Sequence, residues 1–181
     1  LLNTGPTGSG KSTTLYACMK RIATSGIKVI TIEDPIEYHV QGIVQTQVDK
    51  NYTFLQGLRA ALRQDPDVIM VGEIRDEEVA RTAIDAALTG HFVFTTIHTN
   101  NAAGTFPRLV DLGADPKVFS SAVSVAMAQR LVRKLCDNCK KQIPLEGENH
   151  DRLLKVVAGL RDKTVLPPEP YVMYAAVGCE K

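Results

Sequence analysis

The sequence contains no tryptophan, and aromatic residues make up only 6% of its 181 residues. It also lacks a dominant charge, because 21 Lys and Arg residues against 20 Asp and Glu residues leave a formal net charge of +1. No global electrostatic field therefore draws this chain to nucleic acid or to an acidic membrane. Runs of apolar residues, such as Val68 to Val71, are far shorter than the ~20 residues that cross a bilayer. The sequence predicts no transmembrane segment.

Cysteine is scarce, with four residues in the chain. Their small number and uneven spacing exclude a secreted disulfide scaffold, so we expect a reducing compartment. Cys18 lies on an apolar helical stripe, which predicts a buried core thiol. With 44% hydrophobic and 23% charged residues, the chain is too apolar to be disordered. The sequence lacks a starting methionine and a signal segment, and we expect further residues before it.

Alternating strand and helix patterns predict a parallel α/β sheet over residues 1–100. We expect strands at residues 28–33, 43–48, 67–72 and 92–97. We expect helices at residues 12–25, 54–63, 77–88, 102–112, 116–135 and 151–160. Asp76 is expected to cap the helix that begins at residue 77. The prolines of residues 167–170 predict an extended segment.

A phosphate-binding loop lies near the start of the sequence, after a strand end and before the helix expected at residues 12–25. Residues 5–12 read Gly-Pro-Thr-Gly-Ser-Gly-Lys-Ser, which satisfies the G-x-x-x-x-G-K-[ST] pattern. Its glycines allow backbone N–H groups to turn toward phosphates, and the following helix adds the positive end of its dipole. We expect Lys11 to reach the β- and γ-phosphates and Ser12 to hold Mg²⁺. The expected nucleotide-binding residues are Gly5, Pro6, Thr7, Gly8, Ser9, Gly10, Lys11, Ser12 and Thr13.

Acidic and histidine side chains follow three expected strands, at the edge where open α/β sheets bind ligands. Glu73 follows a hydrophobic strand, as a Walker B acid does, and is predicted on the Mg²⁺ side. Glu37, beyond a rigid proline, is predicted to orient or activate water. Glu33 and Asp34 could share or exchange these catalytic roles. His98 is placed to sense or stabilise the γ-phosphate.

These motifs together resemble the secretion ATPases, the hexameric motors of type II secretion and type IV pilus dynamics. Five stretches carry this resemblance, at residues 5–12, 32–37, 58–67, 71–76 and 89–99. Together they look like the family's Walker A motif, Asp box, Walker B motif and His box, which appear in the family's order. The family's Walker B motif ends in Gly-Glu, as Gly72 and Glu73 do here. The resemblance implies a P-loop NTPase (RecA-like) fold, ATP and Mg²⁺ as ligands, and an ATP-hydrolysing motor subunit.

The resemblance also implies partners. It predicts a homo-hexameric ring on the cytoplasmic face of the inner membrane, held there by a membrane platform protein. It implies a preceding N-terminal domain that contributes to the nucleotide site and supplies arginines. Arg59, Arg63 and Arg75 could instead serve pairing between motifs or across interfaces. The chain by itself is then expected to hydrolyse ATP slowly or not at all. A DNA-uptake or nucleic-acid-translocating ATPase on the same fold is the alternative.

Three cysteines lie in the last third of the chain. Cys136 and Cys139 form a C-x-x-C turn that can present two thiolates to one metal, and Cys179 offers a third. The resemblance to assembly-type members of the family implies a C-terminal zinc subdomain, with the fourth ligand just beyond residue 181. His150 as the fourth ligand and a redox dithiol are the alternatives.

The flanks of these cysteines are basic, with Arg130, Arg133, Lys134, Lys140 and Lys141. A zinc ribbon with basic flanks can bind nucleic acid, but aromatic side chains for base stacking are absent there. A solvated face or a protein-docking patch is the favoured interpretation. The expected domains are an ATPase core at residues 1–135 and a cysteine-containing zinc-binding subdomain at residues 136–181.

Overall fold

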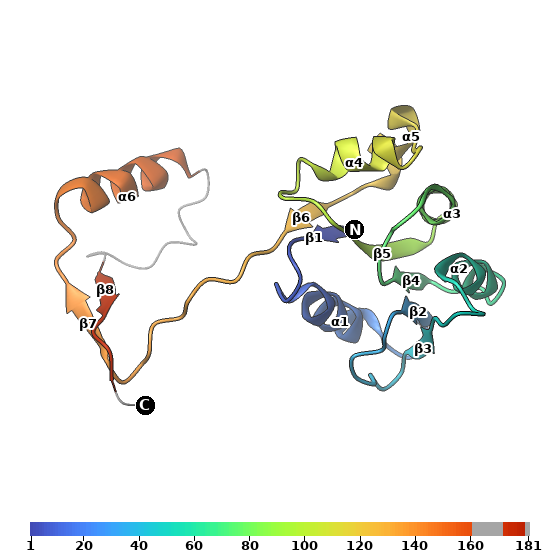
Figure 1. The fold of residues 1–181 in the computed structure, drawn as a ribbon, viewed down its shortest axis with the longest axis horizontal. Helices are drawn as coiled ribbons and strands as arrows, with labels where there is room; N and C mark the ends of the chain where they lie inside the picture. The colour runs from blue at the N-terminus through green and yellow to red at the C-terminus, as the bar shows by residue number, and fades with distance from the viewer. Residues whose placement is uncertain (161–171, 180–181) are drawn as a thin grey trace. The chain divides into compact units, whose positions relative to one another are not determined.

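The computed structural model describes residues 1–160 and 172–179. The chain divides into two compact units, residues 1–131 and 132–181 (Figure 1). The proline-rich segment at 167–170, predicted to be extended, lies outside the described residues. None of the helices in the described part is long and apolar enough to cross a membrane.

The first unit is built on a parallel six-stranded sheet with the strand order β3-β2-β4-β5-β1-β6 (Figure 1). The strands are β1 (Leu2–Thr4), β2 (Val29–Glu33), β3 (Val44–Gln47), β4 (Val68–Val71), β5 (Phe92–Ile97) and β6 (Ala126–Ala128). All residues of β2 and β4 are buried, as expected for strands covered on both faces. The predicted parallel α/β sheet is confirmed.

Helices cover both faces of this sheet. They are α1 (Lys11–Ile22), α2 (Phe54–Leu62), α3 (Glu77–Leu88), α4 (Thr105–Asp111) and α5 (Pro116–Ala122). One core cluster joins α2, α3, α4 and α5 to strand residues that include Ile32, Val71 and Ile97. The other joins α1 to strand residues that include Val29 and Met70. The helix that follows the phosphate loop therefore packs on the face opposite the other four helices.

Side-chain caps fix where α2 and α3 begin. Thr53 accepts a hydrogen bond from the backbone N–H of Gln56, and the Gln56 side chain accepts one from the N–H of Thr53, which forms a capping box. Asp76 caps α3 by accepting a hydrogen bond of 2.9 Å from the N–H of Val79. The predicted cap at Asp76 and the predicted helix over 77–88 are confirmed.

The helix predicted over residues 116–135 is wrong beyond Ala122. The chain leaves α5 there and forms β6, which pairs in parallel with β1. The β-branched Val123 and Val125 disfavour a longer helix, and the free edge of β1 supplies hydrogen-bond partners for a strand. Tertiary pairing thus overrides the helical propensity of the alanines in this segment. As a consequence, Gln129 arrives beside the phosphate loop.

Several other boundaries also differ from expectation. α1 ends at Ile22, before the predicted stop, and α4 begins at Thr105 because the preceding residues form a turn. Cys18, predicted to be buried, is only partly buried at the margin of the core cluster under α1.

In the second unit, a two-stranded antiparallel sheet pairs β7 (Lys140–Ile143) with β8 (Met173–Ala176). Helix α6 (Gly147–Gly159) lies between them in sequence and begins earlier than predicted. None of its residues is buried. Within its described residues, this unit therefore has little apolar core, so we expect other bonds to support it.

Candidate functional site

The loop between β1 and α1 has the conformation that its glycines allow. Gly5, Gly8 and Gly10 have φ angles of 148°, 76° and 87°, a region that residues with a Cβ rarely adopt. At Gly5 a Cβ atom would also lie 2.5 Å from the carbonyl oxygen of Gln129. This close approach requires glycine at position 5.

The loop wraps around the start of α1. The Lys11 Nζ donates hydrogen bonds of 2.9 and 3.1 Å to the carbonyl oxygens of Gly5 and Pro6. Ser9 is buried, and its Oγ has no hydrogen-bond partner among the described residues. Gly10 precedes α1, and in the described chain no side chain caps this helix. Its first backbone N–H groups therefore remain available to an anion.

A cleft of about 350 Å³ lies beside this loop, at the carboxyl ends of β2, β4 and β5. Its lining includes eight sequence-predicted site residues with polar or charged side chains: Thr7, Lys11, Ser12, Thr13, Glu33, Glu37, Glu73 and His98. Gly8 and Gly10 also line it, whereas Gly5, Pro6 and Ser9 belong to the same loop but do not. Segments far apart in the sequence thus meet at one cleft.

Glu73 lies between a guanidinium and an imidazole. Its Oε1 forms an ion pair with Arg75, and its Oε2 lies 3.2 Å from the Nε2 of His98. Arg75 also pairs with Asp34 at 3.2 Å. The hydrogen bond to Glu73 raises the pKa of the Arg75 guanidinium, which therefore stays charged. Arg75 joins the acid after β4 to the acid after β2, so it serves pairing between motifs.

Glu33 is buried under the cleft, at 3% exposure. The hydroxyls of Tyr16 and Thr31 donate to its carboxylate, and the amide of Gln45 donates at 3.1 Å. These donors come from α1, β2 and β3, and together they satisfy the buried charge. Burial and the bond to Glu33 raise the pKa of Tyr16, so its hydroxyl keeps its proton and acts as a donor.

Glu37 lies in a different environment from Glu33. The segment that carries it starts after a cis peptide bond between Asp34 and Pro35, and the side chains of Asp34 and Glu37 are exposed. Of the three carboxylates at the end of β2 and just beyond it, Glu33 is therefore enclosed, whereas Asp34 and Glu37 are open to solvent.

Gln129 ties the phosphate loop to its surroundings. Its side-chain oxygen accepts a hydrogen bond of 2.5 Å from Asn3, and its side-chain nitrogen donates one of 2.7 Å to Thr14. Its backbone N–H donates to the carbonyl oxygen of Thr4 at 2.8 Å. Gln129 thus holds β1, the loop and α1 together from the end of β6.

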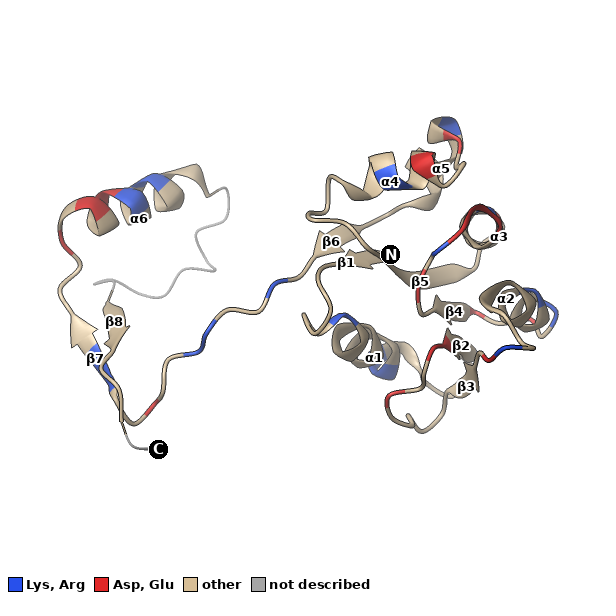
Figure 2. Cartoon of the chain, viewed as in Figure 1, with Lys and Arg blue, Asp and Glu red and all other residues tan. Residues whose placement is uncertain are grey.

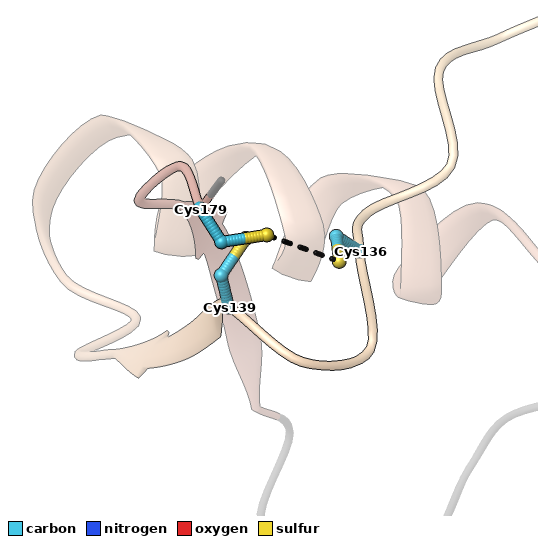
Figure 3. Close-up of side chains that lie close together, drawn as sticks. All are labelled: Cys136, Cys139 and Cys179. Atoms are coloured by element: carbon cyan, nitrogen blue, oxygen red, sulfur yellow. Dashed lines mark hydrogen bonds between the residues drawn. The ribbon is translucent and has the colours of Figure 1, made fainter. Parts of the chain in front are cut away.

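The three cysteines of the second unit come together in space (Figure 3). Their sulfur atoms all lie within 4.8 Å of one another, and those of Cys136 and Cys179 are 3.8 Å apart. The backbone N–H groups of Asn138 and Cys139 stabilise the thiolate of Cys136 and lower the pKa of that thiol. His150 does not belong to this group in the described residues; its Nδ1 lies 3.9 Å from Asp151. The arrangement can hold a metal ion.

The basic residues near the cysteines lie along the stretch after β6 and at β7 (Figure 2). Lys134 and Lys140 pair with Asp137 at 3.5 and 2.6 Å. Arg130 donates to the backbone carbonyl oxygens of Gln129 and Asn100. Part of this positive charge is therefore offset or engaged within the chain.

Sequence reasoning missed two residues of this site. The sequence pattern assigned no role to Tyr16, although a buried tyrosine hydroxyl on an apolar helix face requires a polar partner. Gln129 was placed in the part of the predicted helix that does not form, beyond Ala122. No local signal marks its role, because that role depends on the pairing of β6 with β1.

Comparisons with known proteins agree with this geometry. The chain matches the family described as "Type II/IV secretion system protein" over residues 1–181. It is 50% identical over 183 residues to the type II secretion system ATPase E of Vibrio cholerae, covering 100% of this chain and 34% of that protein. It is 48% identical over 182 residues to the type IV pilus assembly ATPase PilB of Thermus thermophilus, covering 99% of this chain and 20% of that protein.

Solved structures are similar as well. The crystal structure of the pilus retraction motor PilT with bound ADP superposes with a TM-score of 0.61 and 45% sequence identity, covering 72% of this chain and 42% of that one. The fold is therefore that of the secretion and pilus ATPases, as predicted. The chain spans about a third of the length of the first curated relative and a fifth of the second.

Proposed function

This chain belongs to the type II/IV secretion system protein family, and on that premise we propose that it is part of an ATP-hydrolysing motor. The motor would power type II protein secretion or type IV pilus assembly. The observation that carries the proposal is the single cleft that combines a phosphate-binding loop with Glu37, Glu73 and His98. Positioning and electrostatics supply most of the catalysis of phosphoryl transfer, and this cleft provides groups for both.

The phosphates of ATP fit the loop. The uncapped N-terminus of α1 and the unpartnered Ser9 hydroxyl offer donors to an anion. Lys11 would exchange its bonds to the carbonyl oxygens of Gly5 and Pro6 for bonds to phosphate oxygens, which carry more negative charge. We assign Lys11 and the loop amides to phosphate binding.

The donor set beside the loop fits Mg²⁺. Ser12 and Glu73 both line the cleft, and hydroxyl and carboxylate oxygens are the ligands that this ion prefers. When bound, Mg²⁺ supplies positive charge that stabilises the phosphoryl oxygens during transfer. Arg75 and His98 contact the Glu73 carboxylate from either side and hold it in place.

We assign the activation of water to Glu37. Its carboxylate is exposed at the cleft and can accept a proton, whereas the oxygens of Glu33 already accept three side-chain hydrogen bonds. Asp34 is engaged by Arg75. His98 would sense the γ-phosphate through its contact with Glu73. Further arginines would come from residues outside this chain.

We further propose zinc at the cysteine cluster. Zinc–sulfur bonds of about 2.3 Å in a tetrahedral site place two sulfurs about 3.8 Å apart. Cys136 and Cys179 have this separation, and Cys139 lies within the same group. The fourth ligand would lie outside the described residues. The complete protein would assemble as a hexamer at the cytoplasmic face of the inner membrane and act on a membrane platform protein.

The substitution Glu73→Gln in the complete protein tests the proposed function. It should leave ATP binding intact and lower the turnover of Mg²⁺-dependent ATP hydrolysis by ~10²-fold or more, because it removes a positioned carboxylate without changing shape. Glu78→Gln, an exposed acid in α3 outside the cleft, is the matched control and should keep full turnover. Unchanged turnover in Glu73→Gln would remove Glu73 from the mechanism, and a wild-type protein without ATPase activity would overturn the proposal itself.

A further inference from the structure

Tyr16 is a buried polar residue beneath the proposed ATPase cleft. The mechanism proposed above does not use its contacts. It lies on α1, the helix that begins at Lys11, and its side chain is 1% exposed. Leu15 and Met19 on the same helix are completely buried, so the helix has little freedom to move against the sheet. The position of the Tyr16 hydroxyl is therefore fixed relative to the phosphate loop.

The hydrogen bond and the ring contact of Tyr16 lead to the end of β2 and the segment that follows it. Its hydroxyl donates to the buried Glu33 carboxylate. Its ring packs edge-on against Tyr38, with the ring centroids 4.5 Å apart. One side chain from the phosphate-loop helix thus contacts Glu33 and Tyr38, which lie on either side of Glu37, the proposed water-activating acid.

The other donors to Glu33 do not make this connection. Thr31 belongs to β2 itself, and Gln45 belongs to the neighbouring strand β3. Both satisfy the buried charge from within the sheet. Among the residues whose contacts are described, Tyr16 is the donor to Glu33 that comes from the helix carrying Lys11 and Ser12.

We propose that Tyr16 is a positioning residue of the ATPase reaction. Its hydroxyl links the phosphate-loop helix to the Glu33–Tyr38 segment, and so fixes the Glu37 carboxylate relative to the phosphates that Lys11 binds. The inference rests on the proposed function, because it assigns a role within the same cleft. Exact placement has large consequences for catalysis, since a displacement of about 1 Å can lower a rate by about 10²-fold.

The substitution Tyr16→Phe tests this role in the complete protein, because it removes the hydroxyl and keeps the ring that packs against Tyr38. We expect kcat for ATP hydrolysis to fall about 10-fold or more, since Glu37 loses its fixed position. The KM for MgATP and the affinity for ADP should change by less than about 2-fold, because Lys11 and the loop are untouched. Tyr52→Phe, a partly buried tyrosine of the same unit outside the cleft, is the matched control.

A second variant separates positioning from stabilisation. Thr31→Val also removes a donor to Glu33 but leaves the contacts of Tyr16 with Glu33 and Tyr38 in place. If Tyr16 positions Glu37, Tyr16→Phe should lower kcat at least about 5-fold more than Thr31→Val does, even where both variants unfold at similar temperatures.

Three results would overturn the inference: an unchanged kcat in Tyr16→Phe, equal losses of kcat in the two variants, or failure of Tyr16→Phe to fold, which would assign the hydroxyl to stability. These results are distinct from failure of the proposed function, which would show as an inactive wild-type protein.

Discussion

Glu33 and Glu37 lie in one short segment and differ mainly in their surroundings. Glu33 is enclosed and accepts hydrogen bonds from Tyr16, Thr31 and Gln45, whereas Glu37 is exposed at the cleft. A carboxylate whose oxygens are occupied serves as an anchor, and an open one can exchange protons. The sequence could not distinguish them, because the donors to Glu33 come from three different elements of the folded chain.

Gln129 offers a test of the contacts that hold the phosphate loop. Gln129→Ala removes one partner of the Asn3 amide, which is buried, and a side-chain partner of the Thr14 hydroxyl, which is partly buried. We expect the free energy of unfolding to fall by about 1–3 kcal/mol, the usual cost of leaving buried polar groups unpaired. Urea denaturation measures this change, and the affinity for ADP should fall with it because the Gln129 side chain bonds to Asn3 before the loop and to Thr14 after it.

The control for this measurement is Gln64→Ala, a substitution at an exposed glutamine beyond the end of α2. It should change the free energy of unfolding by less than about 0.5 kcal/mol, as surface substitutions usually do. If Gln129→Ala were as stable as the control and bound ADP equally well, the assigned role of Gln129 in holding the loop would be wrong.

At the level of helices and strands, the predictions succeeded where the local pattern and the tertiary environment agree. α3 has a capping aspartate, a periodic apolar face and a glycine after its end, and it forms as predicted. The predicted strand over 92–97 also forms with the expected bounds. The prediction of a helix over 116–135 was wrong beyond Ala122, because β6 is short, rich in alanine and stabilised by its neighbour β1. Strand pairing of this kind is not encoded in any local period.

The cysteine cluster leads to a prediction about the second unit. α6 contributes no buried residue, and the sheet of this unit has two strands, which is marginal for stability in water. A metal ion bound by Cys136, Cys139 and Cys179 would supply the missing stabilisation. Removal of the metal with a chelator should therefore make residues 132–181 sensitive to protease, while residues 1–131 stay resistant.

The proposed metal can be measured directly. Elemental analysis of the complete protein should give about one zinc per chain, and Cys139→Ser should lower this content at least several-fold because it removes a thiolate ligand. Cys18→Ser is the matched control, since Cys18 lies beside the core of the first unit and should not affect zinc content. A complete protein without bound metal would contradict the zinc proposal.

At the level of the whole molecule, the near-zero net charge bears on the choice of partner. The chain carries +1 overall, and Asp137 pairs with two of the lysines beside the cysteines. The basic stretch is therefore a weak candidate for a nucleic-acid surface, which usually requires a concentrated positive field. The relatives that match the chain are named for secretion and pilus assembly.

This reasoning predicts how the ATPase responds to its partners. Double-stranded DNA should leave the ATPase rate of the complete protein unchanged within about 2-fold, because 21 Lys and Arg residues against 20 Asp and Glu residues give this chain no excess of positive charge. The cytoplasmic part of the membrane platform protein should raise the rate. Stimulation by DNA, together with an affinity that falls steeply with salt, would favour the nucleic-acid translocase instead.

The position of β6 has a mechanical consequence. The second unit begins at residue 132, soon after β6 ends at Ala128, and β6 pairs in parallel with β1, the strand that leads into the phosphate loop. A force applied to the second unit and transmitted along the chain therefore reaches the first unit through β6, next to the proposed nucleotide site. Where the pull acts along the strand, the bonds between β6 and β1 are loaded together in shear. A motor subunit built this way would transmit load to the phosphate loop without passing it through the rest of its sheet.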